Sequence, residues 1–404
     1  MNRVLVLSLC VMAGFSACNT MGPKAVRGAR INYNEAIART GDQQLLLNLV
    51  RLKYRDTPLF LEISSVSTQY NLEWSAGASQ SFTDTDTLTG GVTRGATAVA
   101  EAVAGNAANS LRGTGRGTAD RGGSLTRQRV DTDSSGMDVG VGFYERPTIT
   151  YNPLQGEQFV TQLLSPIPLD RLMLLSESGW SVARVFRACL QEMNGLDNAS
   201  SASGPTPSYV PRYEAFREAT ETLRRLQVRG AVDFLQRVDP ETESAYLEMR
   251  FKGDEAKSEE ALAFRDQLRL ASGADEFQLA QSVYDGNADV LAIRPRSLMG
   301  VLHFLSQGVE PPVEHVDQGL VTNTLTDAGT PFDWSAVTGD LFRVHSQGSP
   351  PANAFVRVRY RGQWFYIDDT DLESKTTFGL LTTLFKLQSG DVKTLGPTLT
   401  LPVG

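Results

Sequence analysis

Two stretches of strict alternation constrain the fold of this chain more than any other feature. Over residues 69–82 and again over 137–145, apolar residues occupy every second position and small or polar residues fall between them. This period of two is typical of a strand with one apolar face. We therefore expect the two stretches to be the arms of a long antiparallel β-hairpin. The residues of interest on these arms are Tyr70, Leu72, Trp74, Phe82, Val139, Val141, Phe143 and Tyr144.

The segment between the arms, residues 83–136, has a different composition. It is rich in Gly, Ala and Thr and contains no proline and no residue of the aromatic types Phe, Trp or Tyr after Phe82. Such a segment buries too little apolar surface to order itself alone. We expect a flexible insert at the tip of the hairpin, in which the Ala-rich residues 96–108 form a helix only if another element packs on them.

The N-terminus has the layout of a secretory signal. Arg3 precedes an apolar run over residues 4–15, which is too short to span a membrane as a helix. Residues 15–18 resemble the lipobox of bacterial lipoproteins, although Phe15 stands where leucine is usual. The sequence thus predicts a signal peptide over 1–17, cleavage after Ala17 and acylation of Cys18. The alternative is an ordinary secreted protein in which Cys18 is incidental.

Several expectations follow from a lipidated Cys18. Acyl chains such as palmitate would anchor the chain stably to a bilayer, and residues 18–32 would be a tether. Asn19, in the place where Asp commonly retains Gram-negative lipoproteins in the inner membrane, suggests by that resemblance the outer membrane, with the main body in the periplasm. The net charge of −8 argues against nucleic acid as a partner.

The rest of the chain predicts an α+β fold of mixed helices and antiparallel strands. We expect a helical domain over 33–196 that contains the hairpin, a linker over 197–210, and an α+β domain over 211–404. The last domain is expected to end in a three-strand β-meander over 340–368 followed by a helix to about residue 388. In the first domain, the leucines of residues 42–54 form one apolar stripe, which predicts a core helix ended by Pro58.

The usual catalytic and metal-binding patterns are missing from the sequence. None of His303, His315 and His345 has the spacing of a metal ligand set, and Cys189 lies on an apolar stripe, as a buried thiol would. The carboxylates of 368–373 lie where a strand passes into a helix, which favours helix capping over a cation site. We expect no catalytic residue, metal or cofactor, and hence no enzyme.

Four stretches resemble a family of bacterial envelope lipoproteins that has no assigned function. They are LLLNLVRLKYRDTPLFLEISSV, ERPTITYNPLQGEQFVTQLLSPIP, WFYIDDTDLESKTTFGLLTTLF and the final LTLPVG. The resemblance covers most of the chain outside 83–136. It implies a lipoprotein and brings no enzymatic activity with it.

Three readings of the hairpin remain open. Its arms have about the length of a membrane-crossing strand, ~9–11 residues, so each subunit could donate one hairpin to a closed ring in the bilayer. The hairpin could instead pack on the helices of a soluble domain, or the insert could carry oligomer contacts. The sequence thus predicts a self-assembling structural, scaffold or pore component, with a monomeric periplasmic adaptor or binding lipoprotein as the alternative.

Overall fold

The protein is an α+β chain, as predicted, and its described part falls into two units. The computed structural model describes residues 31–88, 92–103, 127–153, 156–207, 209–241, 243–389 and 399–402. We call Met1–Glu62 with Asn152–Gly396 the core unit, and Ile63–Tyr151 with Pro397–Gly404 the sheet unit. This division differs from the predicted one, in which a linker at 197–210 separates two consecutive domains.

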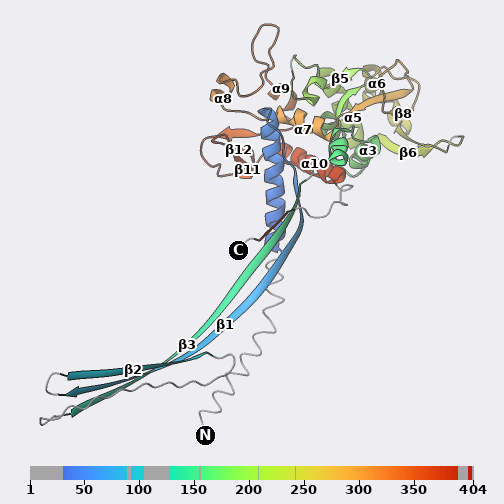
Figure 1. Ribbon diagram of the computed structural model, residues 1–404. Coiled ribbons are helices and arrows are strands. Elements are labelled where there is room, and N and C mark those ends of the chain that lie inside the picture. The colour runs from blue at the N-terminus through green and yellow to red at the C-terminus, as the bar shows by residue number, and fades with distance from the viewer. Residues whose placement is uncertain are drawn as a thin grey trace. The chain divides into compact units, whose positions relative to one another are not determined.

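Most helices of the core unit are short. A first helix covers residues 31–53 and is drawn in blue in Figure 1. The longest of the later helices is α10 (Leu372–Ser389). The others are α2 (Glu157–Leu164), α3 (Leu169–Glu177), α4 (Val182–Cys189), α5 (Glu214–Val228), α6 (Glu259–Gln267), α7 (Leu298–Ser306), α8 (Val313–Asp317) and α9 (Ser335–Thr338), with 3-10 turns η1 (Ser200–Ser203) and η2 (Gly253–Lys257).

The first helix confirms the apolar stripe read from the sequence. Leu46 and Leu49 are fully buried, and Leu45 and Leu52 are nearly so. The helix ends at residue 53, before the predicted stop at Pro58. There the N–H of Asp56 bonds to the carbonyl of Arg51 at 2.8 Å, and Arg55 takes the left-handed conformation with a φ of 58°. This is a Schellman ending, in which a non-glycine residue holds the left-handed position.

A six-stranded sheet organises one part of the core unit, in the order β5-β4-β9-β8-β7-β6. All of its neighbours are antiparallel except β8 and β9, which pair in parallel and are joined by residues 281–289. The parallel pair is an addition to the predicted antiparallel strands. The strands are β4 (Leu190–Met193), β5 (Leu196–Asp197), β6 (Val232–Val238), β7 (Ala245–Phe251), β8 (Glu276–Ala280) and β9 (Val290–Pro295).

The three-stranded sheet near the C-terminal helix corrects the predicted meander. Its strands β10 (His345–Gln347), β11 (Ala354–Tyr360) and β12 (Gln363–Asp368) lie in the order β10-β12-β11. Strands β11 and β12 form a tight hairpin, because Arg361 and Gly362 both have positive φ. Strand β10 does not pair with β11. The intervening Pro350 and Pro351 suit neither a tight turn nor a ladder that needs their N–H groups.

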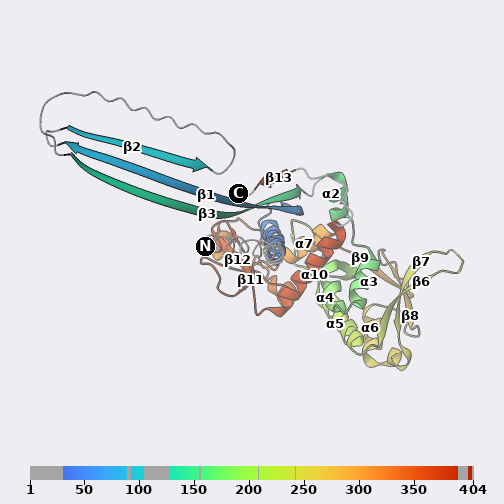
Figure 2. The ribbon, with the colours of Figure 1, turned by 90° about the horizontal axis from the view of Figure 1, so that it is seen from below.

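The helices of the core unit share one apolar interior. Helix α4 contacts α3, α5 and α7, and α10 contacts α7 and α2; Figure 2 shows α7 and α10 next to each other. Fully buried phenylalanines from separate helices, such as Phe186 of α4 and Phe378 of α10, belong to the same hydrophobic cluster. Burial of such large side chains contributes about 2–3 kcal/mol each.

The predicted linker at 197–210 forms part of this core. Within it, β5 pairs with β4, and Ala199 and Ala202 are fully buried. The buried guanidinium of Arg296 also donates to the carbonyl of Asn198 and to the hydroxyl of Ser203. The segment was predicted to be a linker, but its small Ser and Ala residues allow the backbone to pack tightly around a buried cation.

The sheet unit contains β1 (Leu61–Leu88), β2 (Val92–Val103), β3 (Arg127–Pro153) and β13 (Leu399–Pro402), in the order β13-β3-β1-β2. Figure 1 labels β1, β2 and β3. Strands β1 and β2 pair antiparallel from Gly77↔Val103 to Leu88↔Val92. Residues 92–103 of the predicted insert are thus a strand. The helix expected over 96–108 if another element packed on it is not present in the described residues 96–103. Ladder hydrogen bonds to β1 satisfy the backbone here without a large apolar side chain.

Candidate functional site

The sequence-predicted hairpin residues lie in two adjacent strands of the sheet unit. Strands β1 and β3 are neighbours in the sheet. Phe82 lies in the part of β1 that pairs with β2, where Ala98 is its cross-strand partner. Tyr70, Leu72, Trp74 and Phe82 belong to β1, and Val139, Val141, Phe143 and Tyr144 belong to β3.

These strands are much longer than the arms expected from alternation. Strand β1 has 28 residues and β3 has 27. At roughly 3.3 Å per residue, β1 extends over about 90 Å. The predicted arms, 69–82 and 137–145, are only the strictly alternating middle parts of the strands. Residues 83–88 and 127–136 of the expected flexible insert belong to these strands, because a continuous ladder keeps residues of poor β-propensity in a strand.

The outer edges of the long strands are largely without a partner in the described residues. On β3, β13 pairs only with Thr148–Tyr151. On β1, β2 pairs only with Gly77–Leu88. The rest of each outer edge presents main-chain N–H and C=O groups to which another strand can bond. The sheet unit therefore has the chemistry of a pairing surface.

The predicted lipidation residue lies elsewhere. Ala17 and Cys18 fall within residues 1–30, outside the described residues, as does the predicted tether up to residue 30. Cleavage and acylation at this position stay predictions.

The core unit contains a pocket of about 400 Å³ that the sequence analysis did not identify. Its lining comes from the end of the first helix and from the segment between α7 and β10, which includes α8 and α9. Apolar side chains and polar side chains both contribute. Lining residues used below are Lys53, Gln307, Glu310, Thr324, Asp333, Trp334 and Arg343.

Lys53 is the most unusual residue of this pocket. Its side chain is 7% exposed, and its Nζ donates to Oε1 of Gln307 at 3.2 Å. Burial lowers the pKa of the Lys53 ammonium to about 8, because the charged form loses its hydration. A lysine with such a pKa carries its charge at pH 7 but holds it weakly. Buried ionisable groups of this kind are enriched at functional sites.

A second group of charged residues surrounds Glu310. One carboxylate oxygen, Oε2, lies 2.8 Å from Nδ1 of His345, and this hydrogen bond raises the pKa of the imidazole. The other oxygen, Oε1, lies 3.6 Å from Nε of Arg343. That Nε is buried and has no hydrogen-bond partner among the described residues. Glu310 is therefore committed to His345 and Arg343.

The aromatic wall of the pocket is held in place by a hydrogen-bond relay. The indole N–H of Trp334 donates to Oγ1 of Thr324 at 3.2 Å, and this hydroxyl donates to the carbonyl of Pro207 at 2.7 Å. Phe332 packs edge-on against Trp334, with ring centroids 5.4 Å apart. Such fixed polar and aromatic contacts preserve the shape of the cavity.

Burial or a hydrogen bond to the protein accounts for each of the cysteine and two histidines considered for catalysis below. Cys189 is fully buried, and burial raises the pKa of its thiol to about 12, so thiolate is scarce at neutral pH. His303 lies on α7, and burial lowers the pKa of its imidazole. His315 accepts or donates a hydrogen bond at 2.7 Å with the hydroxyl of Tyr54.

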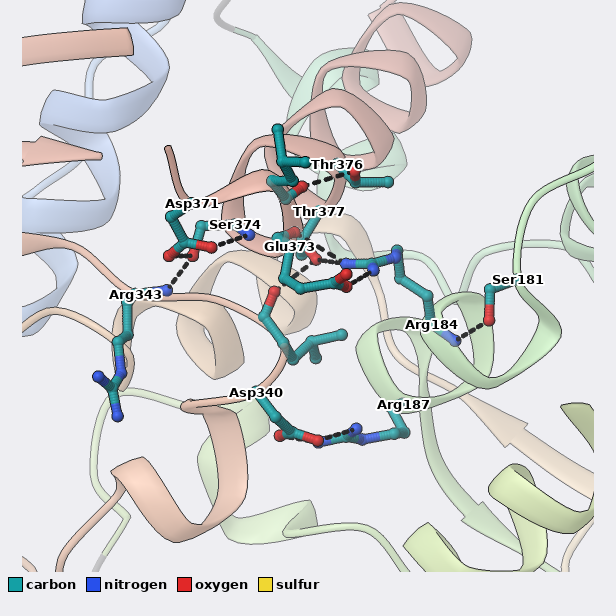
Figure 3. A network of polar contacts seen from close by, with 12 residues as sticks. Ser181, Arg184, Arg187, Asp340, Arg343, Asp371, Glu373, Ser374, Thr376 and Thr377 are labelled. Carbon is teal, nitrogen blue, oxygen red and sulfur yellow. Dashed lines mark hydrogen bonds and ion pairs between the residues drawn. The ribbon is translucent and has the colours of Figure 1, made fainter. Parts of the chain in front are cut away.

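The carboxylate cluster at 368–373 is used by the protein itself, which confirms the predicted capping at Asp371. This residue accepts from the N–H of Ser374 at 3.0 Å and from its hydroxyl at 2.6 Å, and the N–H of Arg343 donates to the same hydroxyl at 2.8 Å (Figure 3). Glu373 pairs with Arg184 of α4. Asp369 pairs with Lys375 at 2.6 Å.

Two further observations bear on function. None of the described helices has both the length and the apolar character needed to cross a membrane. Within the same residues, no group of His, Cys, Asp and Glu side chains is arranged to hold a metal ion.

The position of Lys53 in the sequence is itself a signal of burial. Lys53 follows Leu46, Leu49 and Val50 at helical spacing, so it occupies a position on the apolar face of the first helix. A lysine at such a position is either paired or exposed to a cavity.

Comparison of the chain with family models, curated proteins and solved structures finds no match.

Proposed function

We propose that the chain is a lipoprotein anchored to the outer membrane that self-assembles through its sheet unit as a structural, scaffold or pore component of the bacterial envelope. Its role is non-catalytic. The observation that carries the proposal is the pair of adjacent strands β1 and β3, whose outer edges lack partner strands over most of their length in the described residues.

The physical argument rests on the cost of an open edge. A long strand edge is a template for strand pairing, and proteins that stay monomeric shorten, bend or cover it. Here 28-residue and 27-residue strands form a unit of their own rather than lying within the core unit. Edge pairing between copies would bond the remaining main-chain groups. A lipid on Cys18 would concentrate the copies at one surface.

The mass of the full chain in detergent tests the assembly. Sedimentation velocity of protein extracted from membranes should give a particle of several protomers. Replacing Trp74 and Phe143, on the apolar face of the strands, by Asp should release protomers. Charges on that face would oppose packing of the sheet or its insertion into the membrane. The matched control is Ser75→Asp with Gly142→Asp, at positions that alternate with the apolar ones. It should leave the mass of the particle unchanged. A monomeric wild-type protein would overturn the proposal.

The lipid anchor has its own test. Cys18→Ser should abolish incorporation of labelled palmitate and move the protein out of the membrane fraction. Cys10→Ser, within the predicted leader, and Cys189→Ser, in the core, are the controls and should retain the label. Persistent labelling of Cys18→Ser would contradict acylation at this residue.

The second candidate function is a monomeric adaptor or binding lipoprotein. The pocket at Lys53 is the observation that favours it, since a built cavity with a buried charge suits ligand binding. A monomer in the sedimentation experiment together with ligand binding to the pocket would support this candidate over self-assembly.

A further inference from the structure

The ammonium of Lys53 has donors to spare. A lysine ammonium carries three N–H donors and no acceptor, and the described residues supply one acceptor, Oε1 of Gln307 at 3.2 Å. The side chain is more than nine-tenths buried and lines the pocket. A buried charge without adequate partners costs several kcal/mol. The pocket is the direction from which a further acceptor can reach this nitrogen.

The carboxylates of the pocket do not serve this role. Both oxygens of Asp333 accept from Ser335, one from its N–H at 2.9 Å and one from its hydroxyl at 2.7 Å. Glu310 is engaged by His345 and Arg343. The described structure therefore contains no ion pair to Lys53, although two carboxylates line the same cavity.

The surroundings define the charge of a suitable ligand. Lys53 can neutralise one negative charge. Arg343, the other cation of the lining, is paired with Glu310, and the remaining carboxylate, Asp333, would repel the second charge of a dianion such as phosphate. Much of the remaining lining is apolar, with Trp334 and the residues Val309, Pro311, Val316, Val321 and Phe332. A volume of about 400 Å³ lies in the lower range of small-molecule sites.

We infer that this pocket binds a small ligand that carries one carboxylate on a mostly apolar body, with Lys53 as the cation that receives the carboxylate. The side-chain amide of Gln307 orients the ammonium, and Trp334 packs against the apolar body. This binding site belongs to the core unit and does not depend on assembly of the sheet unit.

The test uses the full chain and N-acetyl-L-leucine as the probe, with N-acetyl-L-leucinamide as its neutral analogue. Isothermal titration calorimetry should show that the acid binds at least about tenfold more tightly than the amide, which is the effect of one charge-assisted contact. Lys53→Met should weaken the acid to the level of the amide. Lys257→Met removes an exposed lysine far along the chain and should leave both affinities unchanged.

A second measurement does not require a variant to fold. N-acetyl-L-leucine should protect Lys53 of the wild-type chain from reductive methylation, measured by mass spectrometry, and leave methylation of Lys257 unchanged. If neither binding nor protection is seen at a probe concentration about tenfold above a Kd of about 1 mM, the inference is overturned. Equal acid affinity in Lys53→Met would also overturn it. Lys53-dependent binding of inorganic phosphate with the same affinity would overturn the assignment to a monocarboxylate.

Discussion

Two buried cations of the core unit differ in how their hydrogen bonds are satisfied. The guanidinium of Arg296 donates to the carbonyls of Arg187 and Ala188, each at 3.2 Å, and to Ser203 Oγ at 2.9 Å. It also contacts the carbonyls of Leu190 and Asn198 and lies 4.1 Å from the ring centroid of Phe304. Arg296 is therefore a structural cation. Lys53 has one acceptor and a cavity beside it.

Arg296→Met should destabilise the protein strongly. Its removal leaves several buried carbonyls without a donor, and we expect a loss of about 3–5 kcal/mol in the free energy of unfolding. The control is Arg294→Met, two residues away on β9, where the side chain is 42% exposed and pairs with Glu192. That change should cost less than about 1 kcal/mol. Urea unfolding measures both, and equal losses would contradict a structural role for Arg296.

The low pKa of Lys53 predicts a pH dependence of stability. The pKa is about 8 in the folded chain and 10.5 as the ordinary value. Between these values the unfolded state binds more protons, so stability rises with pH. Relative to Lys53→Met, the free energy of unfolding of the wild type should rise by about 3 kcal/mol from pH 7.5 to 10.5.

Using Lys53→Met as the reference isolates this residue from the other groups. Hydrogen bonds from Ser335 lower the pKa of Asp333, which also lines the pocket, so its charge does not change over this pH range. The same comparison with Lys257→Met should show no slope. A flat difference between wild type and Lys53→Met would mean that the ammonium is well solvated in the folded protein.

At the scale of elements, caps and turns explain where helices begin. Ser181, Ser258 and Ser297 cap α4, α6 and α7 with their side chains. Helix α7 consequently begins at Leu298, whereas the nearby Pro295 ends β9. Proline is favoured in a first helical turn, but a serine cap satisfies an N–H group and so decided the boundary.

Asp371→Ala should destabilise the protein by about 1–2 kcal/mol. The carboxylate caps the first turn of α10 and holds Ser374, whose hydroxyl receives the N–H of Arg343. Asp369→Ala is the control, since Asp369 is 60% exposed in its ion pair with Lys375 and should contribute less than about 0.5 kcal/mol. Thermal unfolding measures both. Stabilisation of the wild type by Ca²⁺, lost in either variant, would favour a cation site instead.

At the scale of the whole molecule, the two units do not follow each other along the chain. The core unit is assembled from segments before and after the sheet unit, 1–62 and 152–396. Its hydrophobic cluster joins residues of the first helix, such as Leu46 and Leu49, to residues of α10, such as Leu381. The core therefore depends on chain segments that are more than three hundred positions apart.

Replacing residues 63–151 by a flexible Gly/Ser linker should leave the core unit folded. Residues 63–151 belong to the sheet unit and the core unit is made of the other segments, so unfolding of the core unit should stay cooperative with a similar midpoint. Near-ultraviolet circular dichroism during heating measures this. The control is the same replacement of 197–210, which removes the buried Ala199 and Ala202 and should abolish cooperative unfolding. The opposite ranking would restore the division into two consecutive domains.

Local sequence patterns were enough to predict the α+β class, the core stripe of the first helix, capping in the carboxylate cluster at 368–373 and the strand character of 69–82 and 137–145. Each depends on residues within a few positions of one another, where side-chain periodicity and capping act. Tertiary structure decided the order β10-β12-β11, the parallel pair β8 and β9, the extra strand β2 and the pocket at Lys53. Gln307 lies 254 positions from Lys53, and no local pattern encodes that contact. Burial of a charge depends on what the distant chain brings to it.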